Sequence, residues 1–282
     1  MATELLTEVS EDQTQRENWS GGEPPMKASF GKLMMWYFLL SDAFTFCGFL
    51  MGYGALRLSV PTWPVPDFVF QSFPGGFTGL PLIFVTVMSF ILIASSVTMV
   101  RAVQEGKREN RKGVVFWLIM TIIGGGTFLG CQAFEWYNLI AVEKMTVFKN
   151  PFGTHTVDGV YLDENGAELE TFRAGDSYLV HQNAEGDWDF REFRITSGDD
   201  AGKLAYETLG PQTFGSLFFC ITGFHGFHIT IGLFLLIVAT VNAASGLYDR
   251  KKTQYETVEK IGLYWHFVDL VWVFVFLVFY LL

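Results

Sequence analysis

The sequence has little charge, and it lacks the common motifs of nucleotide and redox sites. Charged residues make up 17% of its 282 residues, whereas soluble domains carry about 25%. It contains no P-loop, no glycine-rich dinucleotide motif after a strand, no CxxCH heme-attachment motif and no supported Ser/His/Asp arrangement. We therefore predict that the chain does not catalyse redox chemistry alone. No catalytic residue can be assigned, and nothing indicates a nucleic-acid partner.

The chain has only three cysteines, and they lie far apart in apolar segments. Cys47, Cys131 and Cys220 form neither a CxxC metal-binding spacing nor a recognisable disulfide pair. We expect each of them to be a small buried hydrophobic residue and not a metal ligand.

Long apolar runs take the place of charge. Half of the residues are hydrophobic and 17% are aromatic. Because an α-helix rises about 1.5 Å per residue, about 20 apolar residues cross the roughly 30 Å of hydrocarbon in a bilayer. Five windows are long enough, so we predict an all-α polytopic membrane protein with a bundle of five transmembrane helices. The windows are Leu33–Leu58, Gly79–Val103, Gly113–Val142, Phe214–Gly246 and Ile261–Leu282.

Basic residues gather in two of the connections between these windows. The connection Arg101–Lys112 contains five lysines and arginines, and the connection Asp249–Lys260 contains four. Short loops rich in these residues stay on the cytoplasmic side of a membrane. We therefore predict a cytoplasmic N-terminus and an extracytoplasmic C-terminus. The polar, acidic first 30 residues do not read as a cleaved signal peptide.

The loop between the third and fourth windows is too long for a bare connector. We expect residues 143–213 to fold as an extracytoplasmic insertion between transmembrane helices 1–3 (33–142) and helices 4–5 (214–282), with residues 1–32 as a cytoplasmic segment. From Glu143 to Glu207 there are 14 acidic and 6 basic residues, a net charge of 6 − 14 = −8. This excess would attract a basic partner protein in a salt-sensitive manner.

Turn signals in the insertion predict β-hairpins. Asn165-Gly166 is a strong two-residue hairpin signal, and it lies between Val157–Leu162 and Glu168–Phe172. A second hairpin is predicted from Ser177–His181 and Phe190–Thr196. The insertion is therefore expected to be a small antiparallel β subdomain.

The segment Ser59–Gly76, after the first window, is rich in proline and aromatic residues. Prolines disfavour a continuous helix, and tryptophan and phenylalanine are typical of the headgroup region. We expect this segment to be a turn-rich interfacial cap and not a helix.

Ionisable side chains inside the apolar windows are the most informative residues. Such groups cost about 2.5–3.5 kcal/mol or more in hydrocarbon, so each needs a partner or a purpose. Asp42 lies about 14 Å into the first window, and Asp269 lies at a similar depth in the last, where it shares a helix face with His266. We hypothesise a buried polar layer of Asp42, His266 and Asp269, extended by His228. The alternative is that each side chain has a separate partner.

His225 and His228 share one face of the fourth window, because they are three residues apart. A histidine pair at this spacing can bind a metal or heme iron, but further ligands at a recognisable spacing are lacking. Gly223 and Gly226 lie among these histidines and favour close helix packing instead. Glu135 is near the outer end of the third window, where it is expected to sit in the interfacial aromatic belt.

Two sequence blocks resemble subunit 3 of the heme-copper oxygen reductases, the cytochrome c oxidase family. The family pattern TGFHGxH, with a glycine four residues on, is similar to Thr222–His228 followed by Gly232. The pattern YWHFVDxVW is similar to Tyr264–Trp272, which contains Trp265. Both blocks are specific, and the similarity runs along all five windows.

Two further blocks carry the same resemblance. A pattern of the form GxxFxxxQxxEY is similar to Gly125–Trp136, with Gln132 and Glu135 in place and Trp136 where the family often has tyrosine. The family's SExLFF helix resembles Leu40–Phe46, with Asp42 where glutamate is usual. The shorter acid keeps the charge but changes its reach.

The resemblance implies an accessory subunit of a proton-pumping terminal cytochrome c oxidase. Such a subunit binds no heme or copper, which lie in partner subunits; it packs on subunit 1, is associated with subunit 2, holds structural phospholipid and supports proton uptake. By this resemblance, the structural or lipid-associated residues are Gln132, Glu135, Trp136, His225, Trp265 and Trp272.

The resemblance also predicts how the chain is completed. Family members often have seven helices, and the missing first two are expected from the end of subunit 1, as in five-helix relatives of the bacterial cytoplasmic membrane. The outer insertion, unusual for the family, would contact a cytochrome c or another respiratory complex.

Three other functions stay open on the sequence. The first is the equivalent subunit of a quinol oxidase, whose electron donor cannot be read from this chain. The second is a stand-alone transporter or proton-conducting membrane protein, because intramembrane acids and histidines also form proton relays. The third is a structural interaction protein whose working surface is the β subdomain.

Overall fold

The computed structural model describes residues 29–74, 82–163, 166–183, 185–248 and 255–282. Within these residues, five helices are long and apolar enough to cross a membrane. Two of them end in a π-helical turn, η2 (Asn138–Val142) after α5 and η3 (Leu277–Leu281) after α7. The five helices are α2 (Phe30–Ser59), α4 (Ile83–Lys107), α5 (Arg111–Tyr137), α6 (Gln212–Ala244) and α7 (Tyr255–Phe276).

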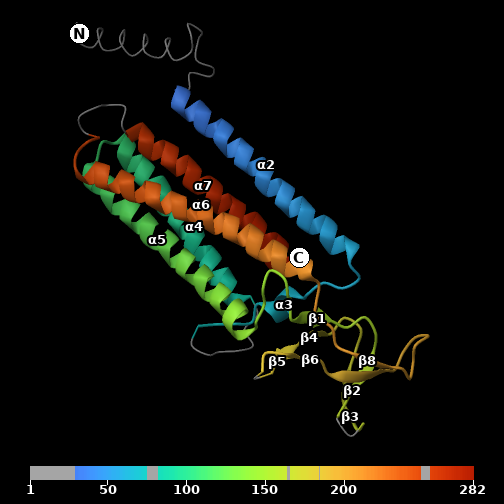
Figure 1. Cartoon of the computed structure of the whole chain (residues 1–282). Coiled ribbons are helices and arrows are strands. Elements are labelled where there is room, and N and C mark those ends of the chain that lie inside the picture. Colours follow the sequence, from blue (N-terminus) through green and yellow to red (C-terminus); the bar gives the residue numbers. More distant parts are fainter. Residues whose placement is uncertain (1–28, 75–81, 164–165, 184, 249–254) are drawn as a thin grey trace, which may run out of the picture.

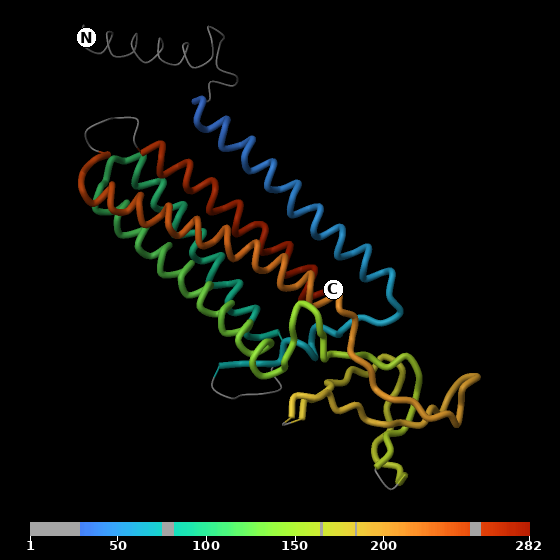
Figure 2. Tube along the Cα trace, in the orientation of Figure 1, coloured from blue at the N-terminus to red at the C-terminus, as the bar shows by residue number. Residues whose placement is uncertain are grey.

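Four of these helices form a bundle, and the first leans against one side of it (Figure 1). Helix α5 packs between α4 and α6, and α7 closes the ring against both α4 and α6. Helix α2 contacts α6 and α7, and its Tyr53 ring lies 4.3 Å from that of Phe279 in η3. In the most apolar window of α2 11% of the residues are buried, compared with 44% in that of the last span. Figure 2 shows that the β subdomain extends beyond one end of the bundle, which is also the end where the chain terminates.

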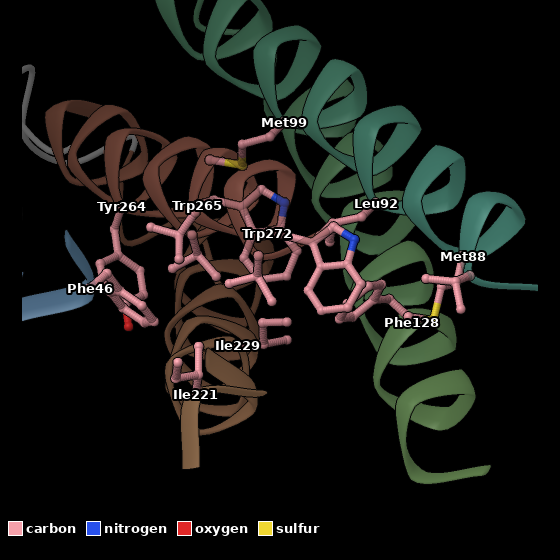
Figure 3. Close-up of a cluster of buried hydrophobic side chains, with 14 of the residues drawn as sticks. Phe46, Met88, Leu92, Met99, Phe128, Ile221, Ile229, Tyr264, Trp265 and Trp272 are labelled. Carbon is pink, nitrogen blue, oxygen red and sulfur yellow. The ribbon is translucent and has the colours of Figure 1, made fainter. Parts of the chain in front are cut away.

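Close packing around two tryptophans forms the centre of the bundle (Figure 3). Trp265 and Trp272 lie on one face of α7, and both are about 1% exposed. Glycines make room for the Trp265 ring, because a Cβ atom on Gly125 of α5 would collide with it and one on Gly232 of α6 would lie 3.1 Å from it. Small residues at such crossings let membrane helices approach closely.

The predicted windows match the helices, with differences at their ends. The start predicted at Gly79 lies outside the described residues. Helix α7 begins at Tyr255, six residues before the predicted Ile261, and its first turns carry charge. Glu259 pairs with Lys32 at 2.9 Å, and Lys260 lies 3.4 Å from Glu256. These ion pairs satisfy charged side chains that hydropathy alone would place in a loop.

The interfacial cap contains a helical turn that was not predicted. Helix α3 (Pro66–Val69) begins with proline, which is tolerated in a first helical turn because no backbone donor is needed there. Val69 and Phe70 are buried, and the Phe70 ring lies 4.3 Å from that of Tyr280. The prediction of a non-helical segment is therefore wrong at these residues, because burial of this apolar pair fixes the turn.

The insertion folds as three small antiparallel sheets. A four-stranded sheet has the order β3-β2-β7-β8, and two-stranded sheets join β1 with β4 and β5 with β6. The strands are β1 (Phe152–Thr154), β2 (Gly159–Leu162), β3 (Glu168–Phe172), β4 (Ser177–Leu179), β5 (His181–Gln182), β6 (Trp188–Asp189), β7 (Glu192–Ile195) and β8 (Leu204–Tyr206). The first predicted hairpin is confirmed, because β2 pairs with β3 on either side of Gly166.

The second predicted hairpin is wrong in its pairing. Strand β4 pairs with β1 and not with β7, and β7 pairs with β2 and β8. Between β4 and β7, the short strands β5 and β6 pair with each other, with His181 opposite Asp189 and Gln182 opposite Trp188. Long-range pairing wins here because Tyr161, Phe172 and Phe193 of the larger sheet share one apolar cluster, which a local hairpin would not form.

Candidate functional site

An acid and an imidazole meet between α2 and α6. His228 Nε2 lies 3.4 Å from Asp42 Oδ2, and the two side chains are 8% and 17% exposed. Phe46 and Phe224 pack their rings around the imidazole, at 5.5 Å and 4.6 Å between centroids. Tyr264 of α7 donates its hydroxyl to the His228 backbone carbonyl at 3.1 Å. Three helices therefore enclose this pair.

The hydrogen bond of His228 to the backbone indicates its tautomer. His228 Nδ1 lies 2.9 Å from the Phe224 backbone oxygen, which can only accept, so Nδ1 carries a hydrogen. The neutral ring then presents the Nε2 lone pair to the Asp42 carboxyl. Two acceptors facing each other at this distance repel, so the contact is favourable when either Asp42 or Nε2 is protonated. The pair is thus a direct contact between an acid and an imidazole within the span.

His266 and Asp269 lie on a different interface, between α7 and α4. His266 Nδ1 is 2.6 Å from Ser96 Oγ, and the same serine interacts with the Asp269 carboxyl. Asp269 is 9% exposed. The predicted layer is therefore divided: Asp42 and His228 form one pair, and His266 and Asp269 share Ser96. This is the alternative in which the groups have separate partners.

His225 is buried in an aromatic enclosure one turn from His228. Its ring stacks on Trp272 at 5.3 Å and meets the edge of Phe128 at 6.2 Å. Neither ring nitrogen has a hydrogen-bond partner within the described residues. Trp272 in turn donates to Ser89 Oγ of α4 at 2.9 Å. These contacts give His225 a packing role between α5, α6 and α7.

Glu135 lies inside the protein and not in an exposed aromatic belt. It is 2% exposed, and its Oε2 atom accepts hydrogen bonds from Gln132 Nε2 and Tyr280 Oη, both at 2.9 Å. The belt prediction for this residue is therefore wrong, because Tyr280 closes over the carboxyl from the η3 turn. Trp136 is partly exposed and packs its ring against Phe219 at 5.3 Å.

The described residues contain no group of three or more metal-ligating side chains. His225 and His228 do not present nitrogens to one point, because Trp272 covers one ring and the other bonds Phe224 and faces Asp42. All three cysteines are unpaired, but Cys47 and Cys220 are exposed. The expectation of burial is wrong for those two, because apolar side chains of a membrane protein also face outward.

A second polar cluster, which the sequence did not reveal, lies inside the β subdomain. Tyr161 Oη donates to Glu207 Oε1 at 2.6 Å. Because its one proton is used there, its oxygen accepts from His155 Nε2 at 2.8 Å and from Arg191 Nη2 at 3.1 Å. Arg191 also pairs with Glu207 at 2.7 Å. The strands bring together residues as far apart as 155 and 207, and no local motif marks them.

Burial shifts the ionisation of this cluster. Burial lowers the pKa of His155 to about 4, and Arg191 adds to the shift while Glu207 opposes it. Burial also raises the pKa of Tyr161, as does the carboxylate of Glu207. At neutral pH the imidazole and the phenol are therefore both uncharged, and the Arg191–Glu207 pair is the charged centre of the cluster.

The fold and the Asp42–His228 pair define a polytopic helical membrane protein with ionisable side chains paired between its spans. Comparison with known sequences narrows this class. Residues 203–282 match the family model described as cytochrome c oxidase subunit III. This segment contains α6 and α7, and hence His225, His228, His266 and Asp269. Together with the relatives described next, this match makes subunit III of the cytochrome c oxidases the family that the chain resembles.

The similarity extends beyond the matched segment. Subunit 3 of a quinol oxidase from Bacillus spizizenii is 27% identical over 253 residues, covering 89% of this chain and 86% of that protein. Cytochrome c oxidase subunit 3 from Synechocystis is 26% identical over 262 residues, covering 93% of this chain and 78% of that protein. The subunit from Triticum aestivum is 42% identical over 73 residues, 26% of this chain and 27% of that protein. Subunits of a quinol oxidase and of a cytochrome c oxidase therefore resemble this chain almost equally.

Proposed function

We propose that this chain is an accessory, non-redox subunit of a proton-pumping terminal cytochrome c oxidase. It packs on subunit 1 and is associated with subunit 2, and heme and copper are bound by those partner subunits. Its place is the bacterial cytoplasmic membrane, with the N-terminus inside and the β subdomain outside. The observation that carries this proposal is the Asp42–His228 pair, because a contact between an acid and an imidazole within the spans suits a subunit that supports proton uptake.

The proposed role in proton uptake follows from the environment of this pair. Phe46 and Phe224 limit access of water, while Asp42 keeps part of its surface uncovered on the α2 side. A group that is enclosed but not sealed can exchange a proton with a neighbouring subunit without a large rearrangement. Asp42 is therefore the donor or acceptor, and His228 holds the proton between transfers.

The outer face of α2 supports contact with subunit 1. Phe44 and Met51 are each 70% exposed, and Trp36 and Tyr37 are each 60% exposed. Helix α2 has neighbours on one side only among the described helices. Helices supplied by the end of subunit 1 would cover this face.

An apolar groove between α2 and α7 supports phospholipid binding. The groove has a volume of about 360 Å³ and contains no ionisable lining residue apart from the thiol of Cys47. Outside the groove, Lys32 of α2 pairs with Glu259 of α7 at 2.9 Å and joins the two helices. An acyl chain fits a groove of this chemistry. Its lining residues include Ala43, Phe46, Leu50, Leu270 and Phe274.

Replacement of Asp42 tests the proposal. The purified oxidase complex with Asp42→Asn should retain its subunits and initial oxygen consumption but take up protons more slowly, and Asp42→Glu should restore uptake. Asp199→Asn, which changes an exposed acid of the insertion, is the matched control and should behave as the wild type. Unchanged proton uptake in Asp42→Asn would remove this role from the chain.

Two other functions are tested separately. The near-equal similarity to quinol and cytochrome c oxidase subunits favours neither donor. The polypeptide and heme content of the gently solubilised complex would decide, because a copper-binding domain and a cytochrome c indicate the proposed donor. A stand-alone proton conductor would instead show Asp42-dependent proton flux when the purified chain alone is placed in vesicles.

A further inference from the structure

A cavity of about 540 Å³ lies between α3 and the β subdomain, away from the Asp42–His228 pair. Helix α3 and the residues after it contribute Asp67, Phe68 and Gln71 to its wall. The β subdomain contributes the opposite wall, which includes Tyr178 and Arg191. A cavity of this size with polar and aromatic walls is typical of binding sites.

His155, Tyr161 and Arg191 line one wall of this cavity, where the Arg191 side chain is 49% exposed and Glu207 holds it from behind. The Arg191 guanidinium lies over the Tyr161 ring, 4.0 Å from its centroid, and bonds Glu207 through both Nε and Nη2. His155 stacks on Phe172 at 3.6 Å. Because Glu207 already balances the charge of Arg191, this wall does not attract a second anion.

The lining of the cavity includes acids from three separate segments. Asp67 comes from α3, Glu170 from β3, and Asp176 from the turn before β4. The basic side chains of the subdomain that form ion pairs use other acids: Arg191 pairs with Glu207, Arg194 with Glu168, and Lys203 with Asp200. In the part of the chain that the structure describes, the three cavity acids therefore have no salt-bridge partner. Folding of the chain places these three acids in the lining of one cavity, where their negative charge would attract an organic cation.

We infer that this cavity receives a lysine or arginine side chain of a basic protein on the insertion side of the membrane. The stem of that side chain would lie against Phe68 and Tyr178, and its charged end would reach Asp67 and Glu170. A protein is the source, and not a free amine, because the surrounding insertion carries a net charge of −8 that attracts a whole basic surface. This inference rests on the proposed function, in which the insertion contacts a partner.

The test compares two double variants of the full complex in lipid nanodiscs. Asp67→Asn with Glu170→Gln removes two acids of the cavity, whose side chains form no hydrogen bond that the fold depends on. Glu185→Gln with Asp199→Asn removes two exposed acids elsewhere in the insertion, so the change in net charge is the same. The probe is a fluorescent tetralysine peptide, and its dissociation constant is measured at low ionic strength, with cadaverine as a free-amine competitor.

The cavity variant should bind the peptide about threefold to tenfold more weakly, because exposed ion pairs contribute modestly each. The matched variant should change binding by less than about twofold. Equal weakening in both variants, no weakening in either, or cadaverine that binds as tightly as the peptide would overturn the inference. The proposed function is tested by a separate result. It would be overturned if the chain did not copurify with heme-copper subunits, regardless of the affinity for the peptide.

Discussion

The Nε2 atom of His228 on α6 and the Oδ2 atom of Asp42 on α2 lie 3.4 Å apart, with Nδ1 of the same imidazole on the Phe224 carbonyl. This contact joins the outlying helix α2 to the bundle through a polar pair that lies within the spans.

Removal of the imidazole should loosen α2. In His228→Phe the Asp42 carboxyl keeps no partner among the described side chains, and leaving a buried polar group unpaired costs about 1–3 kcal/mol. The complex should lose this subunit at a lower temperature than the wild type, as measured by native mass spectrometry after heating. Thr230→Val, an exposed change on the same helix, is the control. Equal thermal stability of the two variants would contradict the pairing.

The tryptophan core predicts opposite outcomes for neighbouring glycines. Gly125→Ala places a Cβ atom against Trp265 and Leu233, so α5 and α7 must separate or the ring must shift, at a cost of about 1–3 kcal/mol. Gly126→Ala has nothing within 4 Å of its new Cβ atom. The midpoint of thermal unfolding in detergent should fall for the first variant and stay unchanged or rise for the second. An equal fall of the unfolding midpoint in both variants would show that helix propensity, and not the contact with Trp265, determines the change in stability.

The C-terminal ends of α5 and α7 are joined through Glu135 and Tyr280. Tyr280→Phe removes one of two donors to Glu135 Oε2, which should cost about 0.5–1.5 kcal/mol. Hydrogen exchange at η2 and η3 should therefore increase. Tyr137→Phe is the control, because that ring is 65% exposed. Protection that stays the same in Tyr280→Phe would mean that packing alone holds these turns.

The β subdomain should lose stability in mild acid. The pKa of His155 falls from 6.5 in the unfolded chain to about 4 when folded, so the unfolded state binds the extra proton first. Its stabilising contribution is complete above pH 6.5 and is lost as the pH falls towards 4. Amide exchange in β2 and β7, corrected for intrinsic rates, should report this loss. His155→Phe should flatten the dependence, whereas His181→Phe, at an exposed position, should retain it.

The groove between α2 and α7 should hold lipid. Ala43→Phe fills part of its 360 Å³, so the purified complex should carry less tightly bound phospholipid, as counted by native mass spectrometry. Val273→Phe is the control. It introduces the same phenylalanine side chain on α7, at a position that is 47% exposed and lies outside the groove. A lipid count that does not differ between the two variants would remove the groove as a binding site.

Several features could be predicted from the sequence because they depend on local chemistry. Membrane spans follow from the length of apolar runs, so the helices were located to within a few residues at most ends. The hairpin around Gly166 followed from its turn residues, since glycine adopts the positive φ of 75° found there. The depth of Asp42 and the shared face of His266 and Asp269 followed from helix geometry alone.

The identities of partners were decided only by tertiary structure. Periodicity gives the depth and the face of a side chain, but the rotation and crossing of whole helices determine which faces meet. Asp42 therefore met His228, and His266 met Ser96, although the depths allowed one common layer. The same reason applies to Tyr161 and Glu207, which lie 46 residues apart and come together only when non-adjacent strands pair.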